Sequence, residues 1–243
     1  MKKKPSSTRN GNVIHTGLVL ACLVLLYIIA QQLTSPDGLL EAASGPSGAQ
    51  KEEFYIYVDL NEDQLYVYQN GELLKTYPCS GGKYTTPSPL GTWKIVSKDT
   101  WNEGFGGTWM ALNVPWGKYG IHGTDEPWTV GSNASKGCIR MYNQDAEEVR
   151  KLVSYGTHVT IVKGTYGYFG DSFRTLKNGH IGSDVYAVQI RLGQLGYYMG
   201  TPDGKFGVGL SDAVKRFKQD HQLGGAPIVD EATYEAMGFF PFE

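Results

Sequence analysis

The sequence predicts an α+β protein: a β-rich domain with one main helix, built like a β-sandwich, is followed by a small all-α domain of three helices. Short runs rich in Tyr, Val and Ile alternate with Gly, Pro and Asn between residues 54 and 163. Apolar residues return at helical spacing after residue 183. An apolar stretch near the N-terminus predicts a transmembrane helix ahead of both domains.

The first 33 residues have the pattern of a membrane anchor. Residues 1–12 are basic, and we expect them to form a cytoplasmic tail under the positive-inside rule. Residues 13–33 are mostly apolar and long enough, at about 1.5 Å per residue, to cross a hydrocarbon core of roughly 30 Å. A cleaved signal peptide is the alternative, although no convincing cleavage site follows Ala30. Residues 34–52 are rich in Gly, Pro, Ser and Ala and indicate a flexible linker.

The β-rich domain is expected at residues 53–163. Its first six strands share β-branched and aromatic residues bounded by Gly, Pro or Asn, and we expect them at 54–58, 64–68, 72–78, 91–97, 109–113 and 119–122. Asn70-Gly71 indicates a hairpin turn between the second and third strands. A helix at 145–155 and a final strand at 158–163 complete the domain.

A second domain is expected at residues 176–240, after a Gly-rich linker at 164–175. Apolar residues from Val185 to Leu195 recur at helical spacing, and the pattern repeats at 212–221 and 230–237. Three small helices in about 60 residues lie near the lower size limit for independent folding.

Composition excludes one class of partner and favours another. The chain has 22 basic and 24 acidic residues and a net charge of −2, so the totals show no electrostatic footprint for nucleic acid. Aromatic residues make up 12% of the chain, with 16 Tyr. Such a composition favours surfaces that stack on sugars or peptides.

Reactive side chains gather between residues 119 and 142. A cysteine has an ordinary pKa of about 8.5, so a nucleophilic Cys138 needs a nearby base or cation, and His122 and Lys136 are the candidates. The intervening segment contains Pro127 and several glycines and can fold back. Gly137 has no Cβ, so a substrate carbonyl can come close to backbone N–H groups that stabilise an oxyanion.

Structural alternatives exist for the same residues. A lone cysteine is more often a small buried apolar residue, and a lone histidine is more often a satisfied structural group. A disulfide between Cys79 and Cys138 would silence the site. A metal site is disfavoured, because no second Cys or His lies near Cys138 at the spacing of structural zinc sites.

Two motifs resemble a known family. HGT at residues 122–124 followed by SKGCIRM at 135–141 is similar to the signature of the L,D-transpeptidase catalytic domain (YkuD-like), histidine-glycine and then Ser-x-Gly-Cys-x-Arg. The TPSPLG segment at residues 86–91 resembles a turn of the same domain, and the resemblance covers residues 54–163.

The resemblance implies a peptidoglycan L,D-transpeptidase. Cys138 would attack the L,D peptide bond of a tetrapeptide donor stem and release D-alanine, and the amine of an acceptor stem would resolve the thioester. His122 would take the thiol proton, and a backbone carbonyl near Gly123 would orient its ring, so that Asp125 is not needed. An L,D-carboxypeptidase or a non-catalytic wall-binding anchor are the alternatives. No cofactor or metal is implied.

Other motif positions carry roles by the same resemblance. Gly137 and Gly123 supply oxyanion or backbone contacts, Ser135 organises the loop, and Arg140 binds substrate or braces the site. Lys136 stands where the family often has histidine, so no second imidazole is available at this position.

The C-terminal domain resembles a three-helix peptidoglycan-binding module. IGSDVYAVQIRLGQLGYY followed by DGKFG carries this likeness, which implies a ligand site near Asp203, Gly204 and Phe206. Lys218 departs from the pattern, because glutamine is common there. The expected partners are therefore peptidoglycan stem peptides and glycan, with both domains on the cell-wall side of a bacterial cell membrane.

Overall fold

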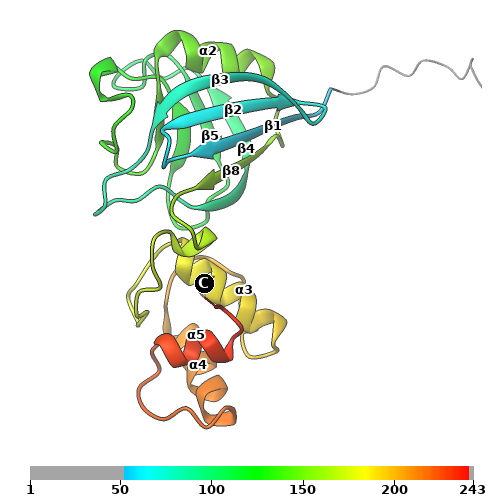
Figure 1. The fold of residues 1–243 in the computed structure, drawn as a ribbon, viewed down its shortest axis with the longest axis vertical. Coiled ribbons are helices and arrows are strands. Elements are labelled where there is room, and N and C mark those ends of the chain that lie inside the picture. Colours follow the sequence, from blue (N-terminus) through cyan, green and yellow to red (C-terminus); the bar gives the residue numbers. More distant parts are fainter. Residues whose placement is uncertain (1–51, 241–243) are drawn as a thin grey trace, which may run out of the picture. The chain divides into compact units, whose positions relative to one another are not determined.

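Eight strands close into a barrel in the computed structural model, which describes residues 52–240 (Figure 1). In chain order they are β1 (Phe54–Asp59), β2 (Gln64–Gln69), β3 (Glu72–Ser80), β4 (Gly91–Asp99), β5 (Trp109–Leu112), β6 (Tyr119–His122), β7 (Ile139–Met141) and β8 (His158–Val162). Around the barrel the order is β1-β2-β3-β7-β6-β5-β4-β8. The expected sandwich is wrong, because β8 pairs with β1 on one side and with β4 on the other and so leaves no gap between two sheets.

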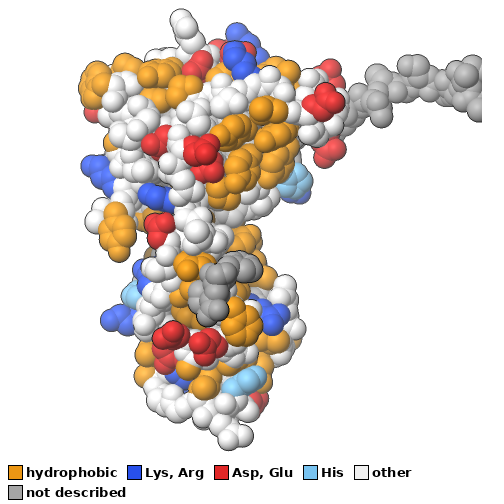
Figure 2. All heavy atoms as spheres, in the orientation of Figure 1, with side chains coloured by type: hydrophobic (Ala, Val, Ile, Leu, Met, Phe, Trp, Pro, Cys, Tyr) orange, Lys and Arg blue, Asp and Glu red, His pale blue; other side chains and the backbone are white. Residues whose placement is uncertain are grey.

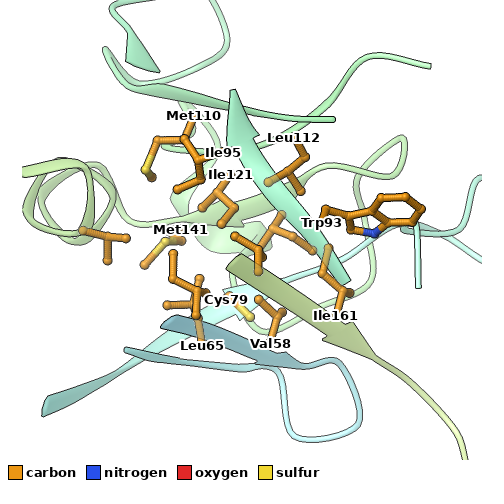
Figure 3. Packing of buried hydrophobic residues seen from close by; sticks show 14 of the residues in the cluster. Val58, Leu65, Cys79, Trp93, Ile95, Met110, Leu112, Ile121, Met141 and Ile161 are labelled. Carbon is orange, nitrogen blue, oxygen red and sulfur yellow. The ribbon is translucent and has the colours of Figure 1, made fainter. Parts of the chain in front are cut away.

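The barrel interior is apolar because each strand turns alternate side chains inward. In β1, Ile56 and Val58 are fully buried, whereas Tyr55 and Tyr57 are only partly buried. Figure 3 shows side chains from several strands meeting in this core. Cys79 lies among them and is fully buried, so it serves as a small apolar residue.

Local sequence explains the hairpin between β2 and β3. Asn70 has φ of 52° and Gly71 has φ of 85°, and two consecutive positive φ angles are typical of the type I′ turn that Asn-Gly favours. This turn was predicted. The short strand β7 was not, because three residues are too few to show a two-residue period.

Two strand pairs are parallel, β1 with β8 and β6 with β7. Parallel neighbours cannot be joined by a tight turn, so a long connection of residues 123–138 links β6 to β7. This connection includes the 3₁₀ turn η2 (Pro127–Thr129).

Helix α2 (Asn143–Leu152) follows β7 directly and is the one helix expected in the β-rich domain. It starts and ends a few residues earlier than predicted. Ala146 and Val149 are fully buried against the barrel core, and Arg150 and Lys151 lie in its last turn, where the helix dipole favours cations.

Three further helices form a helical module with its own core. After the 3₁₀ turn η3 (Gly167–Phe169) come α3 (Ser183–Gln194), α4 (Val208–Asp220) and α5 (Glu231–Ala236), as the apolar spacing predicted. The centre of this core consists of fully buried apolar residues, among them Leu176, Val185, Val188, Leu192, Val214, Phe217 and Val229.

The expected tail at residues 1–12, the transmembrane helix at 13–33 and nearly all of the linker at 34–52 lie outside the described residues. Between residues 52 and 240, no helix has both the length and the apolar character needed to cross a membrane.

Candidate active site

The pairing of β6 with β7 brings His122 and Cys138 to one place. His122 lies opposite Arg140, and Ile121 lies opposite Ile139. The two isoleucines point into the barrel core, so His122 and Arg140 project from the other face of the same two strands, and Cys138 directly precedes β7. If the chain is extended from Cys138 to Arg140, one interstrand step of roughly 4.8 Å and two residues of roughly 6.6 Å put the Cα atoms of His122 and Cys138 about 8 Å apart. Histidine and cysteine side chains can bridge such a separation.

His122 is held as a neutral base. It is 4% exposed, and its Nδ1 is hydrogen-bonded to the carbonyl oxygen of Gly123. A carbonyl only accepts, so Nδ1 carries the hydrogen and Nε2 keeps a free lone pair. Burial lowers the pKa of His122 to about 4, with the positive charge of Arg140 acting in the same direction and the Gly123 contact opposing both. The ring is therefore uncharged at neutral pH.

Cys138 is partly exposed, Cys79 is buried in the barrel core, and both thiols are free. Burial raises the pKa of the Cys138 thiol, against the hydrogen bond from the backbone of Gly120 and the charge of Arg140, which both lower it. The two cysteines do not form the disulfide considered as an alternative. Cys138 and His122 thus rest as an uncharged thiol and imidazole, and the thiol needs a base to become a nucleophile.

Aromatic rings cover the imidazole. Phe105 meets the His122 ring edge-on at 4.8 Å between centroids, and Trp109 lies 5.7 Å away. Trp101 stacks on Trp109 at 4.6 Å. These rings exclude water from His122 and account for its burial. The sequence reasoning missed Phe105, whose only local signal is its place in the Gly-rich run GFGG.

Asp125 supports this aromatic segment and does not contact His122 Nδ1. Its Oδ2 accepts a hydrogen bond from the N–H of Gly104 at 2.7 Å. Because the Gly123 carbonyl already occupies His122 Nδ1, the structure agrees with the implied absence of an acidic third member.

Asn143 fixes the chain just after His122, and the sequence reasoning missed it. Its Oδ1 accepts from the N–H of Thr124 at 2.7 Å. A Cβ at Gly123 would lie 2.5 Å from the same oxygen, so only glycine fits there. Gly123 therefore serves through its carbonyl and its small size.

Ser135 organises the loop that carries Cys138. It is 1% exposed, donates to the carbonyl of Cys138 at 2.6 Å, and accepts from the N–H of Gly137 at 2.9 Å. Gly137 has φ of 113°, and a Cβ there would lie 2.7 Å from the ring of Tyr119. The Gly137 N–H is thus engaged within the loop and is not free to bind an oxyanion, contrary to the expectation for this group.

Arg140 braces the connection between the two strands. Its Nη1 donates to Glu126 Oε2 at 2.9 Å and to Thr129 Oγ1 at 3.1 Å, both in the long connection. Its Nε is buried and has no partner among residues 52–240. Lys136 is exposed, and nothing in the described chain gives it a comparable bracing role.

In the helical module, the expected ligand site is largely structural. Phe206 is 1% exposed within the core, so its assignment as a ligand residue is wrong. Asp203 Oδ1 accepts from Gln189 Nε2 at 2.8 Å and from the N–H of Lys205 at 2.9 Å. The N–H of Gly204 donates to Gln189 Oε1 at 2.7 Å. These residues shape the loop between α3 and α4.

Comparison with protein families identifies both parts of the chain. Residues 53–161 match the family described as "L,D-transpeptidase catalytic domain". Residues 181–237 match the family described as "Putative peptidoglycan binding domain". Both resemblances stated from the motifs are confirmed.

Curated relatives point the same way. "Putative L,D-transpeptidase YkuD" of Bacillus licheniformis is 36% identical over 152 residues, covering 55% of this chain and 90% of that protein. The protein of the same name in Bacillus subtilis is 40% identical over 110 residues, covering 44% of this chain and 65% of that protein.

Solved structures give weaker likenesses. "L,D-transpeptidase from Mycobacterium smegmatis" is 28% identical with a TM-score of 0.39, covering 45% of this chain and 58% of that chain. "Structure of LD transpeptidase LdtMt1 in complex with imipenem" is 24% identical with a TM-score of 0.40, covering 46% of this chain and 60% of that chain. The chain spans less than two thirds of both of these solved chains.

Proposed function

The chain belongs to the family of L,D-transpeptidase catalytic domains, and we propose that it cross-links peptidoglycan stem peptides through the thiol of Cys138. One observation carries the assignment of residues. His122 lies opposite Arg140, two residues after Cys138, and the Gly123 carbonyl holds His122 Nδ1 so that Nε2 stays free to accept a proton.

The first half-reaction forms a thioester. His122 Nε2 takes the thiol proton as Cys138 Sγ attacks the carbonyl carbon of the L,D peptide bond in a donor tetrapeptide. The C–N bond then breaks, and the imidazolium returns the proton to the departing amine of D-alanine. Burial lowers the His122 pKa and keeps the ring neutral, so Nε2 has a lone pair for the thiol proton at neutral pH.

The second half-reaction uses the same groups in reverse. The amine of an acceptor stem attacks the thioester carbonyl, and His122 takes a proton from that amine. The C–S bond breaks, the sulfur is reprotonated, and the new amide is the cross-link. Water in place of the amine would give L,D-carboxypeptidase activity from the same residues.

Arg140 has two functions in this proposal. Its charge favours the thiolate of Cys138 and disfavours the imidazolium of His122. Its bonds to Glu126 and Thr129 also hold the long connection in place while the substrate binds.

We further propose that the reaction takes place on the cell-wall side of the bacterial membrane. Residues 13–33 would anchor the chain, and the helical module would keep it on its polymeric substrate. Cell fractionation and protease accessibility of the intact chain would test this location. Release of the full chain by salt alone would contradict the anchor.

Intact-mass analysis with purified tetrapeptide stems tests the catalytic assignment. Wild-type protein should gain one acyl group on Cys138 with loss of D-alanine, and dimeric muropeptides should follow. A carbapenem should acylate the same residue. Cys138→Ser should lose both adducts, whereas Cys79→Ala, which changes a core cysteine away from the site, should keep them.

The products separate the competing functions. Cross-linked dimers support the transpeptidase, and tripeptides alone indicate the carboxypeptidase. An adduct that persists in Cys138→Ser would show that another residue is the nucleophile. Binding to sacculi with no adduct in wild type would favour the non-catalytic anchor.

A further inference from the structure

The outer face of the barrel carries a tyrosine platform, formed by Tyr55 and Tyr57 on β1 and Tyr66 and Tyr68 on β2. Each tyrosine is partly exposed, because the intervening residues of both strands point into the core. The rings form two tilted cross-strand pairs, with centroids 6.2 Å apart for Tyr55 and Tyr68 and 6.1 Å apart for Tyr57 and Tyr66. Figure 2 shows hydrophobic side chains gathered over this part of the barrel.

The platform continues into hydrogen-bonding side chains on the next two strands. The pairing of β1 with β8 and of β8 with β4 defines two rows across four strands, Tyr68-Tyr55-His158-Lys94 and Tyr66-Tyr57-Thr160-Thr92. Three interstrand steps make each row about 14 Å long. One end of each row offers aromatic faces, and the other offers hydroxyl, imidazole or ammonium groups.

The aromatic end is hollowed. A surface cavity of about 450 Å³ is lined by Glu53, Tyr55, Tyr57, Tyr68 and Gly71. Small-molecule sites are typically concave, mostly apolar, and fitted with a few polar groups. The hollow has the size and the lining of such a site.

Charge narrows the choice of ligand. Carboxylates from Glu53, Asp59 and Glu62 lie at the aromatic end, and Tyr66 donates a hydrogen bond to Glu62 at 2.7 Å. These groups repel polyanions, so nucleic acid and anionic lipid surfaces do not suit the platform. A neutral ligand with one apolar face and many hydroxyl or amide groups does.

We propose that the tyrosine platform binds the glycan strand of peptidoglycan, a β-linked polymer of neutral N-acetylated sugars. The apolar faces of the sugar rings would stack on the tyrosines, while their hydroxyl and acetamido groups would bond to side chains of the neighbouring rows. The inference rests on the proposed function, because the stem peptides that Cys138 acts on are attached to that polymer. The helical module is a separate candidate for wall binding.

The platform lies away from the catalytic strands. Going around the barrel, β3 separates β2 from the catalytic strand β7 in one direction, and β8, β4 and β5 separate β1 from β6 in the other. The platform therefore holds a part of the polymer distant from the scissile bond. It should affect the use of polymeric substrate and leave the use of free stem peptides unchanged.

NMR of the full chain with ring-labelled tyrosine tests the site directly. The probe is the hexamer of β-1,4-linked N-acetylglucosamine, and single Tyr→Phe variants assign the signals. We expect saturable shifts of the Tyr55, Tyr57, Tyr66 and Tyr68 ring signals. Tyr57→Leu, which keeps an apolar side chain but removes the ring, should weaken the affinity reported by the remaining platform signals at least tenfold.

A matched control separates the platform from tyrosines in general. Tyr155 is 67% exposed in the turn between α2 and β8, outside both rows, and Tyr155→Leu should leave the affinity unchanged. The fold of each variant is checked by its unfolding temperature. If Tyr57→Leu fails to fold, Tyr68→Leu provides the same comparison.

Three outcomes would overturn the proposal. The first is a hexamer that shifts only signals of the helical module, and the second is equal binding of the hexamer to wild type and Tyr57→Leu. The third is a response of the platform signals to protein concentration together with dimer formation in light scattering, which would mark the face as a contact between copies. Acylation of Cys138 by free tetrapeptide is measured in parallel. If wild type and Tyr57→Leu are acylated equally, the proposed function stands whatever the fate of the platform.

Discussion

Gln189 of the helical module and His122 of the barrel are both deeply buried, but they differ in how completely their polar atoms are hydrogen-bonded. In the module, Gln189 is fully buried and uses its whole amide group. Its Nε2 donates to Asp203 and Lys205, and its Oε1 accepts from the N–H groups of Asp203 and Gly204. In the barrel, His122 is almost as deeply buried, yet only its Nδ1 has a hydrogen bond among the described residues.

A pair of cations shows the same contrast. Lys218 of the module is 4% exposed and bonds to Asp230 Oδ2 at 3.0 Å and to the carbonyl of Ile228 at 3.4 Å. Arg140 of the barrel keeps a buried Nε without a partner in the described chain. Gln189 and Lys218 are engaged by partners and hold a shape, whereas His122 keeps a lone pair on Nε2 that is available for chemistry.

Removing His122 Nε2, which has no hydrogen bond among the described residues, should have the largest effect on activity. His122→Gln keeps a group that can donate to the Gly123 carbonyl but offers no useful base, so kcat/KM for cross-link formation should fall about 10²-fold to 10⁴-fold. Circular dichroism should show an unchanged fold. Lys136→Ala, at an exposed position two residues before Cys138, should cause a far smaller loss. Equal losses in both variants would mean that the division of roles is wrong.

Lowering the pH should reduce the free energy of unfolding, because the folded chain keeps His122 neutral. Its folded pKa of about 4 lies below the ordinary 6.5, so the unfolded chain binds this proton first as the pH falls. The contribution of His122 to the free energy of unfolding is fully present above pH 6.5 and is lost as the pH falls from 6.5 to about 4. It amounts to roughly 3 kcal/mol. Urea unfolding of wild type and His122→Gln at both ends of this window measures it. Parallel curves for the two proteins would contradict the assignment.

The closed network of the module should yield a stability effect without a catalytic one. Gln189→Leu fills a similar volume but leaves the N–H groups of Asp203 and Gly204 without acceptors, at a cost of about 2 to 4 kcal/mol. Calorimetry should show earlier melting, while turnover of free stem peptides stays at the wild-type level. A loss of turnover with unchanged melting would remove the contrast between the two regions.

The smallest effect is expected at Asp125. Asp125→Asn retains an acceptor for the Gly104 N–H, so kcat/KM should change less than about fivefold, equivalent to about 1 kcal/mol. A true third member of a triad would cost about 10⁴-fold on the same change. Steady-state rates on tetrapeptide stems distinguish the two cases. A loss near the larger value would return Asp125 to the catalytic group.

The sequence predicted the local elements well, because local chemistry determines them. Alternating apolar residues define β1 and β2, and Asn70-Gly71 defines the turn after β2. The Cys138 motif also identified the nucleophile to test, and spacing left room for His122 to reach it.

The features that could not be predicted from the sequence depend on contacts between segments that are distant along the chain. Barrel closure requires β1 to pair with β8 about a hundred residues later, and no local pattern shows that register. The cover of Phe105 on His122 and the bond from Thr124 to Asn143 arise only once the barrel has formed. Phe206 was misassigned because an aromatic residue in a turn-rich motif looks the same whether it faces a ligand or the core.

The parallel pairing of β6 with β7 has an evolutionary consequence. Two parallel neighbouring strands need a long connection, because the chain must run back to the end at which the first strand began. A long connection beside His122 and Cys138 is therefore unavoidable. The part of this connection around Trp128, which is 76% exposed, can gain, lose or exchange residues while the pairing of β6 with β7 keeps the positions of His122 and Cys138. Substrate preference can therefore diversify in this connection. The same segment is a suitable place to introduce new selectivity by design.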